Sequence, residues 1–290
     1  MILVIFGSSG LLGSALLYMA RQRGDIIVLC PRHEEVDIAD EFSVRTFIKA
    51  ARPDAIINCA AHMPADSCET DPHAAYLVNA AGAWNIAIVA EEVSAKCMYI
   101  STDFVFDGIA GAPYGVADMP QPLQVYGKSK AEGEAHTRNI CGQGLVVRTA
   151  SLYGPARGRS RENFIDRMLR RLRAGEEISV VDDVVMSPTY TDDAAAMILA
   201  LLEEPNGIYH AVNRGQASWY ELCVEAAQLS GLDVLNIRPT SLDSMEPVAP
   251  RPRYTVLSAA ELPPRVQMLN RPWREALHSY ISICSGYRGA

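Results

Sequence analysis

The sequence lacks the features of a nucleic-acid-binding or membrane protein. It has no lysine-rich run, and its 34 acidic residues outnumber its 26 basic ones, which gives a formal net charge of -8. A surface that binds nucleic acid or an anionic membrane needs clustered positive charge, so we expect neither partner. The apolar start at residues 1–6 is broken at Gly7, too early for a membrane span or a secretory core. This pattern predicts a cytoplasmic protein.

Cysteine is sparse and scattered. The 290 residues include seven cysteines and no Cys-x-x-Cys pair of the kind that builds metal and redox sites. An odd number without regular spacing argues against a disulfide framework, so we expect most of these residues to be reduced thiols that fill the core. Histidine, cysteine and carboxylate side chains form no compact ligand set, which predicts no catalytic metal.

What the sequence does contain is an alternation of short apolar runs and segments of helical period as far as Val147. Strands that are apolar throughout and joined by helix-length connections predict a parallel sheet covered on both faces, a Rossmann-type doubly wound α/β fold. Ligands of such sheets bind at the carboxyl ends of the strands. The expected strands are 2–6, 26–29, 55–58, 98–101 and 145–148, and the expected helices lie near 11–22, 41–51, 73–93 and 126–140.

The alternation becomes less regular after Thr149. Helices are expected at 163–173, 192–203 and 218–231, a strand at 207–212, and loops at the proline-rich stretches 247–252 and 263–264. We therefore expect a dinucleotide-binding domain over 1–149, to which 187–213 returns. A smaller α/β substrate lobe is expected to comprise 150–186 and 214–290. The sequence leaves open whether the chain forms a homodimer.

A glycine-rich loop follows the first expected strand. Gly7, Gly10 and Gly13 are spaced Gly-x-x-Gly-x-x-Gly and lead into a helix that begins with Leu11 and Leu12. Glycine allows a tight turn and a close approach of backbone N–H groups, including that of Ser9, to a pyrophosphate, which a helix N-terminus favours electrostatically. Its place at the first strand-to-helix turn makes a dinucleotide site the favoured interpretation over a plain structural turn.

The end of the second expected strand bears on cofactor choice. An NAD site usually has an acidic residue there to bind the ribose hydroxyls, but this sequence has Cys30, followed by Arg32. A guanidinium offers a fork of donors to a 2′-phosphate, so we predict a preference for NADPH, with NADH as the alternative cofactor. The competing interpretation is a solvated loop arginine, which the neighbouring Glu34 and Glu35 favour.

Tyr126 and Lys130 form a Tyr-x-x-x-Lys pair at the start of an expected helix. Their i,i+4 spacing places both on one helix face, where the ammonium is expected to lower the pKa of the phenol for proton donation to a ketone. Thr102 follows the fourth expected strand and is placed to bind the substrate carbonyl. A surface ion pair and a strand-end cap are the structural alternatives. The three residues together favour a catalytic site.

The order of motifs resembles that of dTDP-4-dehydrorhamnose reductases, a family of extended short-chain dehydrogenases. The match extends over nearly the whole chain, which is more specific than any one motif. The resemblance implies reduction of the 4-keto group of a nucleotide-linked, dTDP-type 6-deoxy sugar. The motifs are 7–13, 58–62 (Asn-Cys-Ala-Ala-His), 101–108, 126–130, 148–154, 187–191 (Ser-Pro-Thr-Tyr-Thr), 207–210 and 251–253 (Arg-Pro-Arg).

The same resemblance implies roles for particular residues. Thr102, Tyr126 and Lys130 would be the catalytic triad, with Tyr126 as proton donor. Asp103, Phe104 and Ser151 would line the substrate site, where Ser151 replaces a tryptophan that the family often has. Cofactor contacts would come from the pyrophosphate loop (Gly10, Leu11, Leu12), the adenine end (Asp37, Ile38) and the opposite wall (Ala60, Ala61, His62).

Two further points stay open on the sequence alone. Seven arginines between 157 and 173, with Arg251 and Arg253, either meet the substrate diphosphate or form solvated surface. The motifs also fit a regulatory subunit like the β subunit of methionine adenosyltransferase, which binds cofactor without turnover, and a sugar-nucleotide epimerase. Turnover with a keto-sugar nucleotide separates these functions.

Overall fold

The fold is centred on a parallel sheet. The computed structural model describes residues 1–158 and 162–286. Within them, six parallel strands form one sheet in the order β10 (Gly207–His210), β5 (Gly144–Thr149), β4 (Lys96–Thr102), β3 (Ala55–Asn58), β1 (Ile2–Phe6) and β2 (Ile27–Leu29). All residues of β3 and β5 are buried, as expected of central strands that are covered on both faces. The predicted doubly wound α/β fold is confirmed.

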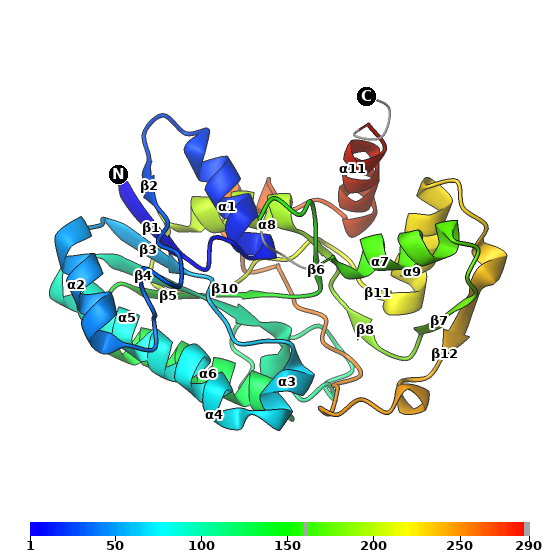
Figure 1. The fold of residues 1–290 in the computed structure, drawn as a ribbon, viewed down its shortest axis with the longest axis horizontal. Helices are drawn as coiled ribbons and strands as arrows, with labels where there is room; N and C mark the ends of the chain where they lie inside the picture. The colour runs from blue at the N-terminus through cyan, green and yellow to red at the C-terminus, as the bar shows by residue number, and fades with distance from the viewer. Residues whose placement is uncertain (159–161, 287–290) are drawn as a thin grey trace.

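Helices cover both faces of this sheet (Figure 1). Leu3 and Ile5 of β1 point to one face and pack into a core with α1 (Leu11–Arg21) and α8 (Thr191–Leu201). Val4 and Phe6 point to the other face, where the core includes α2 (Glu41–Ala51) and α5 (Gly82–Glu92). The period of two along β1 thus divides its side chains between two cores. The α6 helix (Val125–Ile140) packs against β4 and β5.

The expected helix at 73–93 is interrupted. The structure has α4 (Pro72–Tyr76), a π-helical turn η1 (Leu77–Ala81) and then α5, preceded by a short helix α3 (Ala65–Thr70) that the sequence did not predict. Tertiary contacts hold the turn, since the carbonyl oxygen of Asn79 accepts a hydrogen bond from the Tyr99 hydroxyl at 2.7 Å and its amide donates to Ser129 at 3.0 Å. The break therefore depends on residues distant in sequence.

Outside the main sheet lies a smaller group of elements with its own core, at the right of Figure 1. Its helices are α7 (Phe164–Arg173), α9 (Trp219–Leu229) and α11 (Trp273–Gly286). Ser218 begins α9 with a capping box, in which its side chain accepts from Glu221 N while the Glu221 carboxylate accepts from Ser218 N. The strand pairs are β7 (Ile178–Val181) with β12 (Ile237–Thr240), β8 (Val185–Met186) with β11 (Ala217–Ser218), and β6 (Leu152–Tyr153) with β9 (Thr189–Tyr190).

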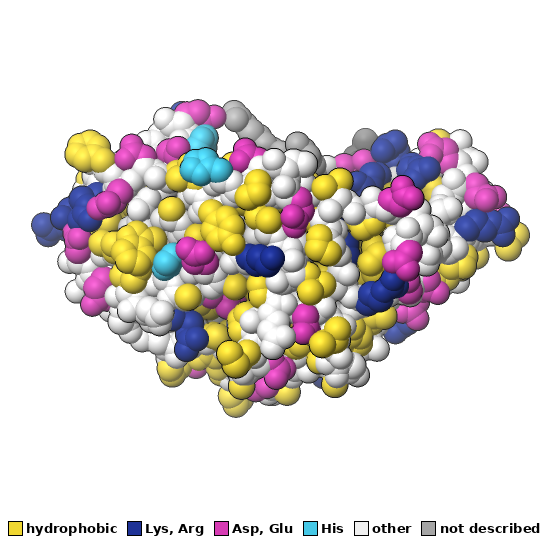
Figure 2. Space-filling view, turned by 90° about the horizontal axis from the view of Figure 1, so that it is seen from below, with side chains coloured by type: hydrophobic (Ala, Val, Ile, Leu, Met, Phe, Trp, Pro, Cys, Tyr) yellow, Lys and Arg dark blue, Asp and Glu magenta, His cyan; other side chains and the backbone are white. Residues whose placement is uncertain are grey.

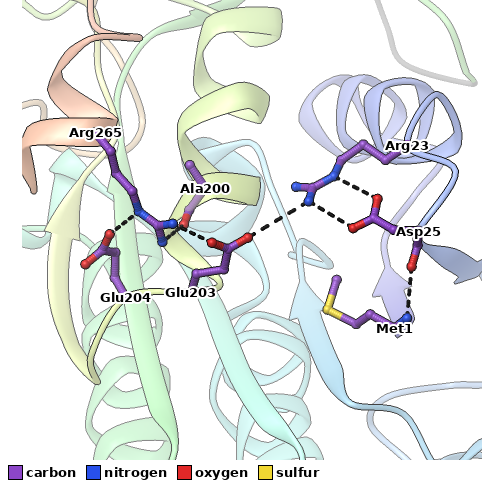
Figure 3. A network of polar contacts seen from close by, with 7 residues as sticks. All are labelled: Met1, Arg23, Asp25, Ala200, Glu203, Glu204 and Arg265. Atoms are coloured by element: carbon purple, nitrogen blue, oxygen red, sulfur yellow. Dashed lines mark hydrogen bonds and ion pairs between the residues drawn. The ribbon is translucent and has the colours of Figure 1, made fainter.

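A surface network joins late segments of the chain to the first strand (Figure 3). Arg265, in α10 (Pro264–Gln267), pairs with Glu203 and Glu204 just after α8. Glu203 also lies 3.9 Å from Arg23, which pairs with Asp25. The terminal amine of Met1 donates to the Asp25 carbonyl at 2.9 Å, so these contacts join α8 and α10 to the amino edge of the sheet.

The remaining short elements are η2 (Asp103–Val105), η3 (Val234–Asn236) and η4 (Leu242–Met245).

The face covered by α4, α5 and α6 carries apolar side chains among the charged ones (Figure 2). Leu77 and Trp84 are 39% and 42% exposed on this face, and the Trp84 ring packs edge-on against His136 at 4.9 Å. Among the described residues, no helix is both long and apolar enough to cross a membrane.

Candidate active site

The glycine loop forms a tight turn at the carboxyl end of β1. Gly7 has a left-handed φ of +74°, and a Cβ there would lie 2.6 Å from the backbone nitrogen of Ala60. A Cβ on Gly13 would lie 2.2 Å from the Gly7 carbonyl oxygen. Gly10 is the N-cap of α1, and in the described part of the chain no side chain caps this helix start. The first N–H groups of α1 are therefore left for another acceptor, which fits a pyrophosphate.

Ala60, Ala61 and His62 follow β3 and lie beside this loop. Cys59 N donates to the Phe6 carbonyl at 3.0 Å, which joins the ends of β1 and β3. The position of His62 is fixed by Asn79, which accepts from His62 N at 2.8 Å and donates to the His62 carbonyl at 3.2 Å. The glycine loop and this segment, both predicted to contact the cofactor, therefore lie side by side.

After β2, Arg32 lies exposed on the surface, whereas Asp37 and Ile38 lie in the more buried segment that follows. The Arg32 side chain is 68% exposed and pairs with Glu35 at 2.8 Å. This pair raises the pKa of Arg32 and lowers that of Glu35. The Asp37 carboxylate accepts from Ala39 N at 3.0 Å, while the Ile38 side chain is buried where a Cβ on Gly82 would meet it. Arg32 must leave Glu35 to bind a 2′-phosphate.

The structure brings Thr102, Asp103, Phe104 and Tyr126 together. Thr102 ends β4 and caps η2, where its hydroxyl oxygen accepts from Phe104 N at 3.2 Å. The Phe104 and Tyr126 rings meet edge to face, with centroids 6.2 Å apart. The Thr102 side chain lies near enough to Tyr126 to favour its phenolate. The predicted proton donor and the predicted carbonyl-binding hydroxyl thus lie in the same place, at the carboxyl end of β4.

The pKa of Tyr126 is raised in this structure, not lowered as predicted. Burial is the largest cause of the rise, the nearby Asp103 carboxylate adds to it, and the Thr102 side chain opposes it. Burial raises the pKa of Asp103 itself to about 6. Loss of water disfavours the phenolate more than these polar contacts favour it. The phenol is therefore protonated at neutral pH.

Lys130 lies one turn further along α6 and is 2% exposed. Its ammonium donates to the Ile100 carbonyl at 2.6 Å and lies 3.9 Å from the centroid of the Tyr99 ring. Burial lowers its pKa to about 7, against an increase caused mainly by Glu134. With a pKa near neutral pH, Lys130 gains or loses its charge when the nearby charges change.

The other predicted substrate residues lie on the side of the smaller lobe. Ser151 has a left-handed φ of +44°, and its carbonyl accepts from Thr189 N at 3.2 Å. Arg251 pairs with Asp66 at 2.8 Å, and its guanidinium carbon lies 5.9 Å from the centroid of the Phe104 ring. Arg253 is held by Asp183 and Asp243. Of these two arginines, Arg251 is the one beside the site.

Most described arginines of the 157–173 segment pair with carboxylates. Arg157 pairs with Asp192 and lies over the Tyr18 ring, and Arg170 and Arg171 pair with Glu162 and Glu176. Arg159 and Arg161 lie outside the described residues. Gly158 nevertheless approaches the glycine loop, because a Cβ there would lie 2.5 Å from the Ser9 carbonyl oxygen.

Several groups at the site were missed by sequence reasoning. Thr255 lies near Asp103 and lowers the pKa of that carboxyl. Glu134 forms a buried pair with Arg148 beside Lys130. Only Glu134 had a signal, its i,i+4 spacing from Lys130. In the described part of the chain, no group of three or more His, Cys, Asp or Glu side chains is placed to hold a metal ion.

The chain is similar to known proteins over nearly its whole length. Residues 1–285 match the family described as the RmlD substrate binding domain. The chain is 38% identical over 289 residues to a dTDP-4-dehydrorhamnose reductase of Mycolicibacterium smegmatis, covering 98% of this chain and 86% of the relative.

Two solved structures are similar over nearly the full length. A dTDP-4-dehydrorhamnose reductase of Clostridium acetobutylicum is 34% identical with a TM-score of 0.91, covering 98% of this chain and 100% of the other. A Bacillus anthracis dTDP-4-dehydrorhamnose reductase in complex with NADP is 34% identical with a TM-score of 0.89, covering 97% and 98%. This chain belongs to the RmlD substrate binding domain family.

Proposed function

We propose that this chain is an NADPH-dependent oxidoreductase that reduces the 4-keto group of a dTDP-linked 6-deoxy sugar. The arrangement at the carboxyl end of β4 carries this proposal, since Thr102 bonds to Phe104 N and the Phe104 ring packs on Tyr126, which brings a carbonyl-binding hydroxyl near a proton donor. The names of the relatives and the NADP in the Bacillus anthracis structure support the substrate and the cofactor.

The cofactor is proposed to bind residues 1–149 with 187–213, and the sugar nucleotide to bind 150–186 with 214–290. The glycine loop fits a pyrophosphate, because a Cβ on Gly7 or Gly13 would meet backbone atoms in a turn this tight. Gly7, Ser9, Gly10, Leu11 and Leu12 would hold the pyrophosphate. The adenosine half would lie against Arg32, Asp37 and Ile38, and the opposite wall would be Ala60, Ala61 and His62.

When bound, NADPH supplies a hydride to the carbonyl carbon of the substrate. Thr102 would orient the carbonyl oxygen, and Tyr126 would donate its proton to that oxygen as the carbon is reduced. The raised pKa of Tyr126 suits a donor, because the proton stays on the phenol until the substrate oxygen gains charge. The Lys130 ammonium, one helical turn away, would stabilise the phenolate that remains.

Asp103, Phe104 and Ser151 are proposed to line the sugar site. The half-buried Phe104 ring and a small hydroxyl would define a site that excludes water on one side of the sugar ring. We also propose that the protein works in the cytoplasm, which fits cysteines that form no disulfide among the described residues. Whether it forms a homodimer is measured by light scattering on the purified chain.

Turnover tests this proposal. Purified protein is mixed with NADPH and a dTDP-4-keto-6-deoxy sugar, and the loss of reduced nicotinamide absorbance is followed. We expect stoichiometric oxidation of NADPH. Cofactor binding without oxidation of NADPH by any keto-sugar nucleotide would contradict it and favour a regulatory subunit. Sugar isomerisation without net NADPH loss would favour an epimerase.

A further inference from the structure

Two buried cations flank a buried carboxylate behind the proposed catalytic residues. Arg148 is 0% exposed, Lys130 2% and Glu134 4%. Arg148 donates from Nε and Nη2 to the two Glu134 oxygens at 2.9 and 2.7 Å. Lys130 and Glu134 are four residues apart on α6, which makes them neighbours on one helix face. One carboxylate therefore pairs with a cation on a strand and shares a helix face with a second cation.

The other groups around Lys130 supply no formal negative charge at neutral pH. Ile100 offers a carbonyl and Tyr99 a ring face, both neutral acceptors of a cation. Burial raises the pKa of Tyr99, and it raises that of Cys59 to about 12, so both are protonated. Tyr126, one turn back on α6, is also protonated, as described above. Asp103 on η2 acts on Tyr126 rather than on Lys130.

We propose that Glu134 is the counterion that keeps the buried Lys130 ammonium charged, and that Arg148 holds this carboxylate in place and shares its charge. Glu134 is a positioning residue, because it acts through Lys130 and contacts neither proposed substrate nor cofactor group. Its importance for turnover rests on the proposed function, in which a charged Lys130 stabilises the phenolate. The charge state itself is a property of the chain alone.

Arg148 gives this arrangement its rigidity. Its guanidinium carbon lies 4.9 Å from the centroid of the Phe106 ring, which stacks on Tyr114 at 4.1 Å. The same arginine thus joins α6, which carries Tyr126 and Lys130, to the loop that begins at Thr102. An arginine remains protonated in proteins, whereas a lysine releases its proton when its surroundings disfavour charge. Any loss of negative charge at Glu134 should therefore lower the protonated fraction of Lys130, while Arg148 stays charged.

The test measures the titration of Lys130 directly. The chain has only four lysines, at positions 49, 96, 128 and 130, so lysine labelled with carbon-13 at Cε gives four NMR signals. The Lys130 signal is identified by its loss in Lys130→Arg. In Glu134→Gln two buried cations would remain without a carboxylate. We therefore expect the midpoint of the Lys130 titration to fall by about one pH unit or more.

Glu132→Gln is the matched control. It makes the same chemical change on the same helix, at a side chain that is 48% exposed and lies 3.4 Å from His136. The Lys130 midpoint should stay within a few tenths of a pH unit of the wild type, because exposed charges are strongly screened. A Lys130 midpoint that does not fall in Glu134→Gln overturns the proposal.

Arg148→Gln separates a charge effect from structural damage. Without the guanidinium, Lys130 would be the only buried cation beside Glu134 in this group of three residues. The Lys130 midpoint should therefore rise in Arg148→Gln, whereas it should fall in Glu134→Gln. Loosening of the site would admit water and raise the midpoint in both variants, which would also overturn the proposal. The titration needs neither cofactor nor sugar. Absence of turnover in the wild type would contradict the proposed function and leave this measurement unaffected.

Discussion

The Thr102 hydroxyl donates a hydrogen bond to the carboxylate of Asp103 at 3.0 Å. The threonine hydroxyl has one proton, so it serves either this carboxylate or a substrate carbonyl at any moment. Thr255 also favours the Asp103 carboxylate, so the charge of Asp103 does not depend on Thr102 alone. Asp103 is thus placed to control both the direction of the Thr102 proton and the acidity of Tyr126.

Replacing Asp103 with Asn should change how stability depends on pH. Burial raises the Asp103 pKa from 3.8 to about 6, so the folded chain holds this proton more tightly than the unfolded chain. Its contribution to stability is full below about pH 4 and is lost, by about 3 kcal/mol at most, as the pH rises through about 6.

Asn does not ionise, so the free energy of unfolding of Asp103→Asn, relative to that of the wild type, should increase over this pH window. Urea unfolding of both proteins between about pH 4 and 7 measures the difference. A difference that is constant with pH would contradict the raised pKa.

Tyr126→Phe should abolish reduction and leave cofactor binding intact. The change removes only the hydroxyl, and the ring can still pack edge-on against Phe104. Loss of a proton donor is expected to lower kcat by about 100- to 10,000-fold. Steady-state rates give kcat, and quenching of protein fluorescence gives the Kd for NADPH, which should stay within about twofold. Activity comparable to the wild type would remove Tyr126 from the proposed role.

The fold was predictable wherever the signal is local. The strand at 55–58 and the helix at 41–51 match the structure because an apolar run or a helical period, with Asp40 as N-cap, is encoded in adjacent residues. The break at Leu77–Ala81 was not predictable, since it depends on Tyr99 and Ser129. The expected strand at 207–212 ends at His210, where the chain leaves the sheet edge.

The site residues, too, fall into those with a local sequence signal and those whose contacts appear only in the folded structure. Tyr126, Lys130 and Thr102 carry their signal in spacing and in their position after a strand. The direction of the Tyr126 pKa shift was mispredicted because burial cannot be read from an i,i+4 spacing. Arg148 and Glu134 come together from a strand and a helix, so their pairing appears only in three dimensions.

Gly7→Ala should weaken NADPH binding and lower stability together. The residue has a φ of +74°, and the new Cβ would lie 2.6 Å from Ala60 N, so the loop or the 59–62 segment must move. A cost of about 1–3 kcal/mol in the free energy of unfolding is expected. Gly24→Ala is the control, because a Cβ there meets nothing within 4 Å among the described residues. Urea unfolding and the Kd for NADPH should change only in the Gly7 variant.

The Arg32–Glu35 pair should set the preference between NADPH and NADH. Arg32→Ala removes the proposed partner of the 2′-phosphate and should lower kcat/KM for NADPH by about tenfold or more, with little change for NADH. Glu35→Gln should act in the opposite direction, because it removes the carboxylate that competes for the guanidinium at 2.8 Å. Arg170→Ala breaks a similarly exposed Arg–Glu pair in α7 and should leave the ratio of the two efficiencies unchanged. Equal losses with both cofactors in Arg32→Ala would show that the arginine supports the loop and does not read the 2′-phosphate.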